Sequence, residues 1–174
     1  YNNSERYINL NNWSLAGHNN QRLITDSNEI IAPSTFKVIT NDATILKDHY
    51  PNALESTFII TTLPNLTSTE GTVSLIDDHG DVIDLMNYKE EYHSDLLNDL
   101  NGVSLERIRP ESSSIDPSNW FSASSSENFA TPGYQNSQFL MGQEQDGSIV
   151  ITPLTFAPDE PGRANFTTLN YEFD

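Results

Sequence analysis

Short β-type runs separated by turn residues constrain the fold of this chain more than any other feature of its sequence. The runs are rich in β-branched and aromatic residues, or alternate apolar with polar residues, and they span 35–40, 57–62, 72–76, 82–86 and 103–106. Such alternation places one face of a strand on a core and the other toward water. Strands that recur at roughly 8–12-residue spacing are typical of a β-sandwich, so we expect an all-β fold of that kind.

Near the start of the chain, two alternating pairs have opposite parity. The pair Ile8/Leu10 alternates with polar neighbours in one phase, and the pair Trp13/Leu15 does so in the other. A regular strand cannot keep both pairs on one face, because successive side chains point to opposite faces. The sequence therefore predicts a bulge or break at Asn11–Asn12.

Two local signals predict how the strands are connected. The acidic segment 77–81 contains a glycine for a positive-φ position, which predicts a hairpin loop between its flanking strands. A short helix is expected over 43–50, because Asn41 or Asp42 can cap it and Pro51 ends it.

The chain of 174 residues divides into three parts by its composition. We expect a β-sandwich over 1–138 and a polar linker over 139–147. The remainder, 148–174, holds two strand-like stretches that could pair, at 148–153 and 167–173. It is too short for an independent core, so it is either the start of a second β unit or an extension packed on the first.

The charge balance excludes several classes of function. There are 8 basic and 25 acidic residues, for a net charge of -17. Nucleic acid is therefore a poor partner, because binding to it depends on Lys and Arg at the phosphates. No apolar run approaches the ~18 residues of a membrane span, so no membrane insertion is expected. Without cysteine, the chain has no disulfides, zinc knuckles or thiol catalysis.

The sequence contains no catalytic motif. It lacks G-x-S-x-G, H-E-x-x-H, an H-x-H pair and a glycine-rich phosphate loop. Its four histidines, at positions 18, 49, 79 and 93, lie in different segments, and no serine has a base within a recognisable spacing. We therefore expect no enzymatic activity in this chain.

Acidic residues crowd the predicted hairpin and form the candidate metal site. Four aspartates, which could offer hard oxygen ligands to calcium, are Asp77, Asp78, Asp81 and Asp84. Their positions do not follow an EF-hand loop, and the ordinary interpretation is a solvated turn. No other cofactor is expected.

A second candidate for metal binding comes from alternation. Glu91, His93 and Asp95 would share one face of an extended backbone and could form a mixed site. The ordinary alternative is a loop histidine that binds a backbone carbonyl.

The adjacent charges Glu106 and Arg107 must point to opposite faces of a strand. Arg107 shares the parity of Val103 and Leu105, so we expect Arg107 to be partly buried. A buried guanidinium requires a carboxylate or several carbonyls. We expect it to pin the sandwich together rather than to bind a ligand.

The two tryptophans could lie in the core or form sugar-stacking platforms. In β-sandwiches a tryptophan within an alternating strand usually lies in the core, and we expect this of Trp13. We expect it of Trp120 too, although Trp120 lies in a serine-rich segment that resembles a loop. A carbohydrate-binding surface would require exposure of Trp120, Phe121 and Tyr134. The segment Thr131-Pro132-Gly133 is expected to form a rigid turn at the end of the domain.

Four N-x-S/T sequons occur, at Asn2, Asn12, Asn65 and Asn165. In a chain so rich in Asn, Ser and Thr they are chance matches unless the host glycosylates them.

Several motifs in order resemble the lamin tail domain family. They are the Y-N-N-S-E-R-Y-I-N-L-N-N-W-S-L-A opening (1–16), the proline-led strand 31–39, the G-x-V-x-L-x-D hairpin 71–84, the SLERI-containing segment 102–108, Asn119-Trp120 and the ATPGYQNS segment 130–137. Each motif alone is weak, but their order over about 137 residues is specific, and the last three resemble bacterial members.

The resemblance implies an immunoglobulin-like β-sandwich with one short helix, in a secreted or surface protein of the kind found in Bacteroidetes. It also implies a first strand upstream of Tyr1, without which the sandwich would have an unpaired edge and an open core. Residues 151–159 resemble the start of an immunoglobulin-like repeat, although Glu160-Pro161-Gly162 departs from its usual continuation.

The expected function is a non-catalytic interaction or scaffolding module of a larger envelope protein, extracellular or associated with the outer membrane. Its partner would be a protein or glycan at the cell surface, and the chain would be a monomer or weak dimer. The alternatives are a calcium-stabilised adhesion module and a carbohydrate-binding accessory domain of a secreted hydrolase.

Overall fold

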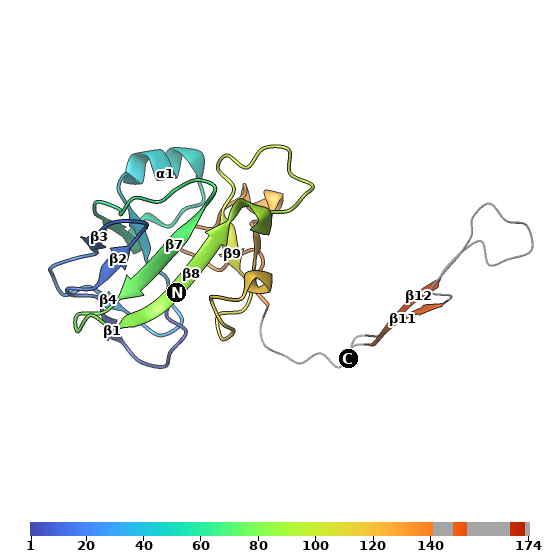
Figure 1. The fold of residues 1–174 in the computed structure, drawn as a ribbon, viewed down its shortest axis with the longest axis horizontal. Coiled ribbons are helices and arrows are strands. Elements are labelled where there is room, and N and C mark those ends of the chain that lie inside the picture. The colour runs from blue at the N-terminus through green and yellow to red at the C-terminus, as the bar shows by residue number, and fades with distance from the viewer. Residues whose placement is uncertain (141–147, 153–167, 173–174) are drawn as a thin grey trace, which may run out of the picture. The chain divides into compact units, whose positions relative to one another are not determined.

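The structure is a computed structural model that describes residues 1–140, 148–152 and 168–172. The chain divides into two compact units, Tyr1–Met141 and Gly142–Asp174. The described part is mostly β-strand, in sheets that are antiparallel apart from one strand pair, with one short α-helix (Figure 1). This architecture is compatible with a β-sandwich.

The strands of the first unit are short, as the sequence predicted. They are β1 (Ile8–Asn9), β2 (Ser14–Ala16), β3 (Gln21–Leu23), β4 (Ile30–Ile31), β5 (Val38–Thr40), β6 (Phe58–Ile60), β7 (Glu70–Ile76), β8 (Val82–Lys89), β9 (Leu105–Arg107) and β10 (Trp120–Ser122). The helices are α1 (Ala43–His49) and the 3₁₀ turns η1 (Glu55–Thr57), η2 (Glu90–Tyr92), η3 (Pro117–Asn119) and η4 (Ser125–Glu127).

The main sheet is antiparallel, with the strand order β3-β2-β7-β8. Its long hairpin pairs β7 with β8, and the register shifts between Leu75 and Ile76. The predicted hairpin loop is confirmed, because the Asp77 amide donates to the carbonyl of Asp81 at 3.0 Å and Gly80 has a φ of 90°. Since β8 is the last strand of this order, one of its two sides has no strand partner among the described residues.

Three smaller strand pairs complete the unit. β1 pairs with β4 and β9 with β10, both antiparallel, whereas β5 pairs with β6 in parallel. A parallel pair needs a crossover connection between its strands, and α1 lies in that connection. The predicted cap of α1 is confirmed, since the Asp42 carboxylate accepts the Ile45 amide at 2.9 Å.

The predicted break at Asn11–Asn12 is also confirmed. Asn12 takes the left-handed conformation, with a φ of 62°, and separates β1 from β2. The Trp13 amide donates to the carbonyl of Leu10, which closes a tight turn at this point. The turn changes the parity, so Leu10 and Trp13 both reach the core region.

The hydrophobic core of the first unit is small. Its buried cluster consists of Leu10, Ile24, Ile31 and Ile59, and the partly buried residues packed against it are Ile8, Trp13, Leu15, Ile39 and Leu75. No large side chain in the described residues is completely buried. A domain of this length normally closes its core more fully.

The second unit contains β11 (Ser148–Thr152) and β12 (Thr168–Glu172). They pair antiparallel, from Ser148 opposite Glu172 to Thr152 opposite Thr168. The predicted pairing of the two C-terminal strands is therefore confirmed. The linker segment 141–147, the sequon at Asn165 and the repeat-like segment beyond Thr152 lie outside the described residues.

None of the helices in the described ranges has the length and apolar character needed to cross a membrane.

Candidate functional site

The short strand β9 is the centre of a polar network that occupies one end of the first unit. Pairing with β10 keeps its backbone extended, so neighbouring side chains point to opposite faces. Glu106 and Arg107 therefore meet different surroundings, and each makes long-range contacts.

Glu106 is buried, with 4% of its surface exposed. One carboxylate oxygen accepts the Thr131 hydroxyl at 2.5 Å. The other accepts the Ser137 hydroxyl at 2.7 Å and the Gln138 amide at 3.1 Å. The expected partial burial of Arg107 is confirmed, since its side chain is 23% exposed, but the expectation that Arg107 is the inward-facing member of the pair is wrong. Glu106 is the more buried of the two because the returning segment 131–138 covers its face and supplies three donors, and nothing near Glu106 in the sequence indicates this.

Arg107 lies on the opposite face and is half-buried. Its Nη1 contacts the Asp84 carboxylate on β8 at 3.0 Å, and its Nη2 donates to the Ser112 carbonyl at 2.5 Å. These are the carboxylate and carbonyl partners that a buried guanidinium requires. Its Nε atom is also buried but has no hydrogen-bond partner.

The Asn119-Trp120 motif holds the loop that precedes β10. The buried Asn119 amide donates to the carbonyls of Arg109 and Ser113, at 3.0 and 3.2 Å, and accepts the Arg109 amide at 2.8 Å. The Trp120 indole donates to the carbonyl of Ser114 at 2.9 Å. The motif therefore satisfies the polar backbone of a loop that would otherwise leave buried groups unpaired.

The Pro132-Gly133 turn returns the chain to the start of the network. Gly133 has a φ of 90°, and a Cβ at this position would lie 2.3 Å from the Thr57 hydroxyl oxygen. The Leu54 amide donates to the Pro132 carbonyl at 3.0 Å. Three residues later, the Asn136 side chain donates to the Arg107 carbonyl at 2.9 Å. The turn thus directs the closing segment back onto β9.

At the other end of the chain, Asn2 fastens the opening turn. Its side-chain nitrogen donates to the carbonyls of Arg6 and Ile31, at 2.7 and 3.2 Å, and its oxygen accepts the Ser4 amide at 3.0 Å. Asn2 is 4% exposed, so the asparagine of the sequon that begins there is buried in the folded domain.

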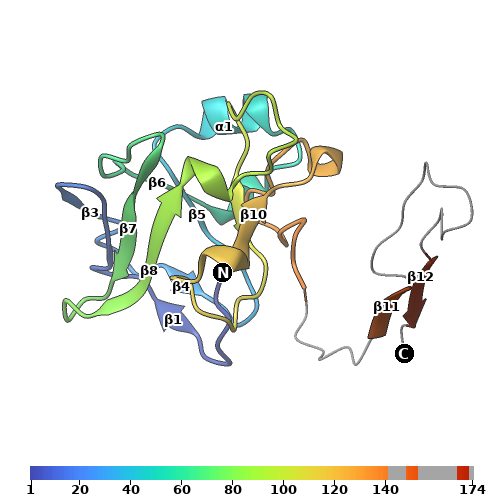
Figure 2. The same ribbon diagram turned by 45° about the vertical axis from the view of Figure 1, so that its right-hand side comes forward.

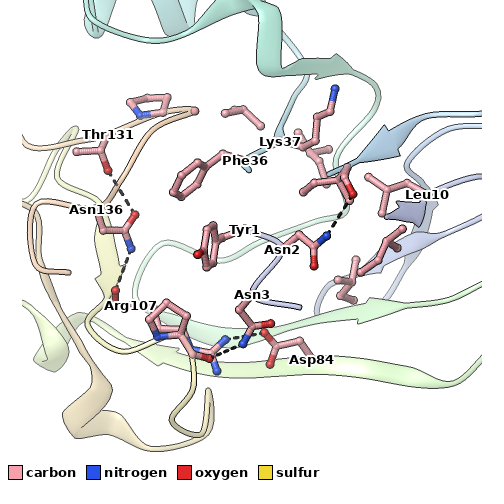
Figure 3. A pocket seen from close by; sticks show the side chains of 18 of the residues that line it. Tyr1, Asn2, Asn3, Leu10, Phe36, Lys37, Asp84, Arg107, Thr131 and Asn136 are labelled. Carbon is pink, nitrogen blue, oxygen red and sulfur yellow. Dashed lines mark hydrogen bonds and ion pairs between the residues drawn. The ribbon is translucent and has the colours of Figure 1, made fainter. Parts of the chain in front are cut away.

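A cavity of about 810 Å³ lies against the core (Figure 3). Most of the core cluster lines it, since Ile8, Leu10, Trp13, Ile24, Ile31, Ile39 and Leu75 all contribute to its wall. The polar part of the wall includes Asn2, Asn3, Asp84, Arg107 and Asn136. The face of Arg107 thus meets open space, whereas the face of Glu106 is covered.

Strand β8 contributes to the wall of this cavity. Ile83 and Asp84 of β8 line the wall, and 51% of the Ile83 surface is exposed. The Leu85 amide donates to the Asp84 carboxylate at 3.0 Å, and the same carboxylate also accepts the Ser114 hydroxyl. Figure 2 shows the N-terminus between β8 and β10, next to this edge.

Both tryptophans line the cavity, and both are partly buried. Trp13 packs against the core cluster, as expected. Phe121 is 43% exposed, but it follows Trp120 on β10 and so points to the opposite face. Tyr134 is partly buried and donates to the Glu127 carboxylate at 3.1 Å; burial, and then this hydrogen bond, raise the pKa of Tyr134. The exposed aromatic strip that a sugar platform requires is not formed by these residues.

The four predicted metal-ligand aspartates do not come together. Asp77 and Asp78 lie with His79 in the hairpin loop, where three candidate ligand atoms are within 4.8 Å of one another. The Asp77 carboxylate accepts the amides of Asp81 and His79, at 2.8 and 2.9 Å, and these bonds lower the pKa of Asp77. Asp84 is engaged with Arg107 instead.

The predicted triplet Glu91, His93 and Asp95 is not formed as expected. Glu91 lies in η2, so the backbone is not extended there. His93 instead contacts the buried Ser122 hydroxyl on β10 at 2.9 Å, and burial lowers the pKa of His93. The Ser122 oxygen also accepts the Ser94 amide at 2.9 Å. A separation of 29 residues gives no sequence signal for this contact, which joins η2 to β10.

In comparisons with known proteins, no family model, no curated protein and no solved structure matches the chain.

Proposed function

We propose that this chain is a non-catalytic interaction or scaffolding module of a larger bacterial envelope protein, located outside the cell or at the outer membrane. Its fold would be an immunoglobulin-like sandwich of the lamin tail type. The module would make protein–protein or domain–domain contacts.

One observation carries this proposal: the side chains of the motifs that carry the resemblance make hydrogen bonds within the domain itself. Glu106, Asn119 and Asn136 direct their polar atoms to backbone groups or to side-chain hydroxyls of the same domain. A catalytic or ligand-binding group would instead direct polar atoms toward a space that substrate can enter. The residues that carry the resemblance therefore support a structural role, and recognition falls to the cavity and the exposed strands.

The direct test is affinity capture from solubilised bacterial envelope with the full chain immobilised. We expect one protein or glycan to be retained in moderate salt and to be released by an excess of the same chain in solution. The matched control is the chain after thermal unfolding, which keeps the charge but loses the fold. Equal retention by both forms, or recovery of no specific component, would contradict an interaction function.

The hairpin loop supports a second candidate, a calcium-stabilised form of the same module. Asp77, Asp78 and His79 place three candidate ligand atoms close together on an exposed turn. Calcium would then raise the melting temperature, and a chelator would lower it. Asp78→Asn is the control variant. If calcium leaves the melting temperature of the unmodified chain unchanged, as it does that of Asp78→Asn, this candidate is ruled out.

A further inference from the structure

The face of the main sheet that points away from the core is uncharged over two rows of residues. We propose that this face is a contact surface for a second copy of this chain, so that two sheets stack face to face in a weak dimer. The inference goes beyond the proposed function and does not depend on it.

Strand register identifies the residues of this face. Leu15 and Leu75 are paired and pack against the core cluster, so their neighbours on β2 and β7 point the other way. The strands β2, β7 and β8 lie side by side in Figure 1, and the pairings continue the face across β3 as well. We call its two uncharged rows the outer patch, which consists of Leu23, Ser14, Ile76 and Val82 in one row and Gln21, Ala16, Ser74 and Leu85 in the next.

The outer patch is open to solvent and partly apolar. Val82 is 56% exposed and Leu23 is 43% exposed. In the part of the chain that the structure describes, the side chains of the patch make no hydrogen bond and no ion pair. None of the patch residues lines the cavity, which lies on the opposite side of the sheet together with Tyr1. An apolar sheet face is normally covered by another layer of structure.

The sizes of the side chains fit a second copy of the same patch. Ser14 and Ala16 on β2 are small, whereas Val82 and Leu85 on β8 are larger. A two-fold axis that runs along β7, between two stacked sheets, would place β8 of each copy over β2 of the other. The larger side chains of each copy would then fill the space above the smaller ones. Two-fold dimers that use one patch twice are the commonest protein assemblies.

The distribution of charge favours this face over the rest of the surface. The chain carries a net charge of -17, so two copies repel each other. Contact through the outer patch buries no ionised side chain and brings no like charges together within it. In the two-fold arrangement the acidic hairpin loops 77–81 lie at the same end of the dimer. Because salt screens this repulsion, we expect the dimer to become stronger as the salt concentration rises.

The area of the face sets the strength of the dimer. The 4-stranded sheet and the 7 residues of β7 limit the buried area to about 450 Å² per copy. A stable interface buries about 800 Å² per partner. We therefore expect a reversible dimer that forms only at high protein concentration.

The first test is sedimentation equilibrium of the full chain over a range of concentrations, in low and in high salt. We expect a monomer–dimer equilibrium that salt shifts toward the dimer. Val82→Lys should weaken the dimer at least about tenfold, because it buries an unpaired charge. Ile60→Lys, at a 66% exposed position on β6, adds the same charge outside the patch and should weaken it much less. The melting temperature of each variant checks that it is folded.

Cross-linking then locates the contact without weakening it. The chain has no cysteine, so Ser74→Cys places a single thiol on β7, close to the proposed axis. A short bis-maleimide should link two copies of this variant at least about tenfold faster than two copies of Ile60→Cys, because stacked sheets lie only about 10 Å apart. Equal rates for the two variants would mean that the copies meet by random collision.

Other outcomes would also overturn the assignment. A chain that stays monomeric at every concentration in high salt has no such contact. A dimer that persists in Val82→Lys uses another surface, such as the edge of β8. Loss of the dimer in a longer chain that includes residues before Tyr1 would assign the patch to a segment of the same chain. Envelope capture that Val82→Lys abolishes, from a chain that remains monomeric, would assign the patch to a different protein.

Discussion

The two faces of β9 differ in how completely their polar groups are satisfied. Glu106 is 4% exposed and accepts three hydrogen bonds from the segment that closes the domain. Arg107, its neighbour, has a buried Nε without a partner and faces a cavity of about 810 Å³. The Glu106 face is thus fully hydrogen-bonded, whereas the Arg107 face keeps one unpartnered donor. The comparison indicates where the domain gains its stability.

The largest expected effect is on the closed face. Glu106→Ala leaves the donors of Thr131, Ser137 and Gln138 without their acceptor, so we expect a loss of about 3–4 kcal/mol in the free energy of unfolding. Urea denaturation followed by tryptophan fluorescence measures it. The matched control is Glu111→Ala at an exposed position, which should change stability by less than about 0.5 kcal/mol. Equal losses in the two variants would show that the face is not closed by Glu106.

The turn that returns the chain to this face should have the next largest effect. Gly133 has a φ of 90°, and Gly133→Ala adds a Cβ that would collide with the side chain of Thr57. We therefore expect a loss of about 2–3 kcal/mol in the free energy of unfolding. Gly80→Ala is the control, because Gly80 has the same φ but open space around it. It should lose only about 1 kcal/mol, for the backbone conformation alone. If thermal denaturation gives both variants the same loss, the close contact at Gly133 has no effect.

The open face should tolerate change. Arg107→Leu removes the contact with Asp84, whose side chain is 44% exposed, and also removes the unpartnered Nε atom. These effects oppose each other, and an ion pair whose carboxylate is exposed to solvent contributes about 1 kcal/mol. We therefore expect a smaller loss than for Glu106→Ala. A loss as large as that of Glu106→Ala would mean that both faces are equally important to stability.

The smallest effect concerns pH. Burial lowers the pKa of His93 in the folded chain, so the unfolded chain binds the proton more readily. Stability should be greatest above about pH 6.5 and should decline as the pH falls below it toward the folded-state value. His93→Gln should flatten this decline in melting temperature between about pH 7.5 and 5.5 relative to the unmodified chain. An identical pH profile in the two proteins would exclude His93 as the cause.

Local patterns were sufficient to predict the elements that depend on neighbouring residues. Alternation located most of the strands, the cap and the proline delimited α1, and the change of parity located the break at Asn11–Asn12. Each of these features is set within a few residues of the chain. Strands β3, β4 and β10 were missed, because their segments do not alternate apolar with polar residues.

Tertiary structure decided the rest, because the decisive contacts join distant parts of the chain. The burial of Glu106 depends on a segment about 25–32 residues away, and the contact of Arg107 with Asp84 spans 23 residues. Strand alternation shows only that Glu106 and Arg107 face opposite ways, and it cannot show which face another segment will cover. The same reason explains why the aspartates of the hairpin separate, with Asp84 paired to Arg107 rather than to Asp77 and Asp78.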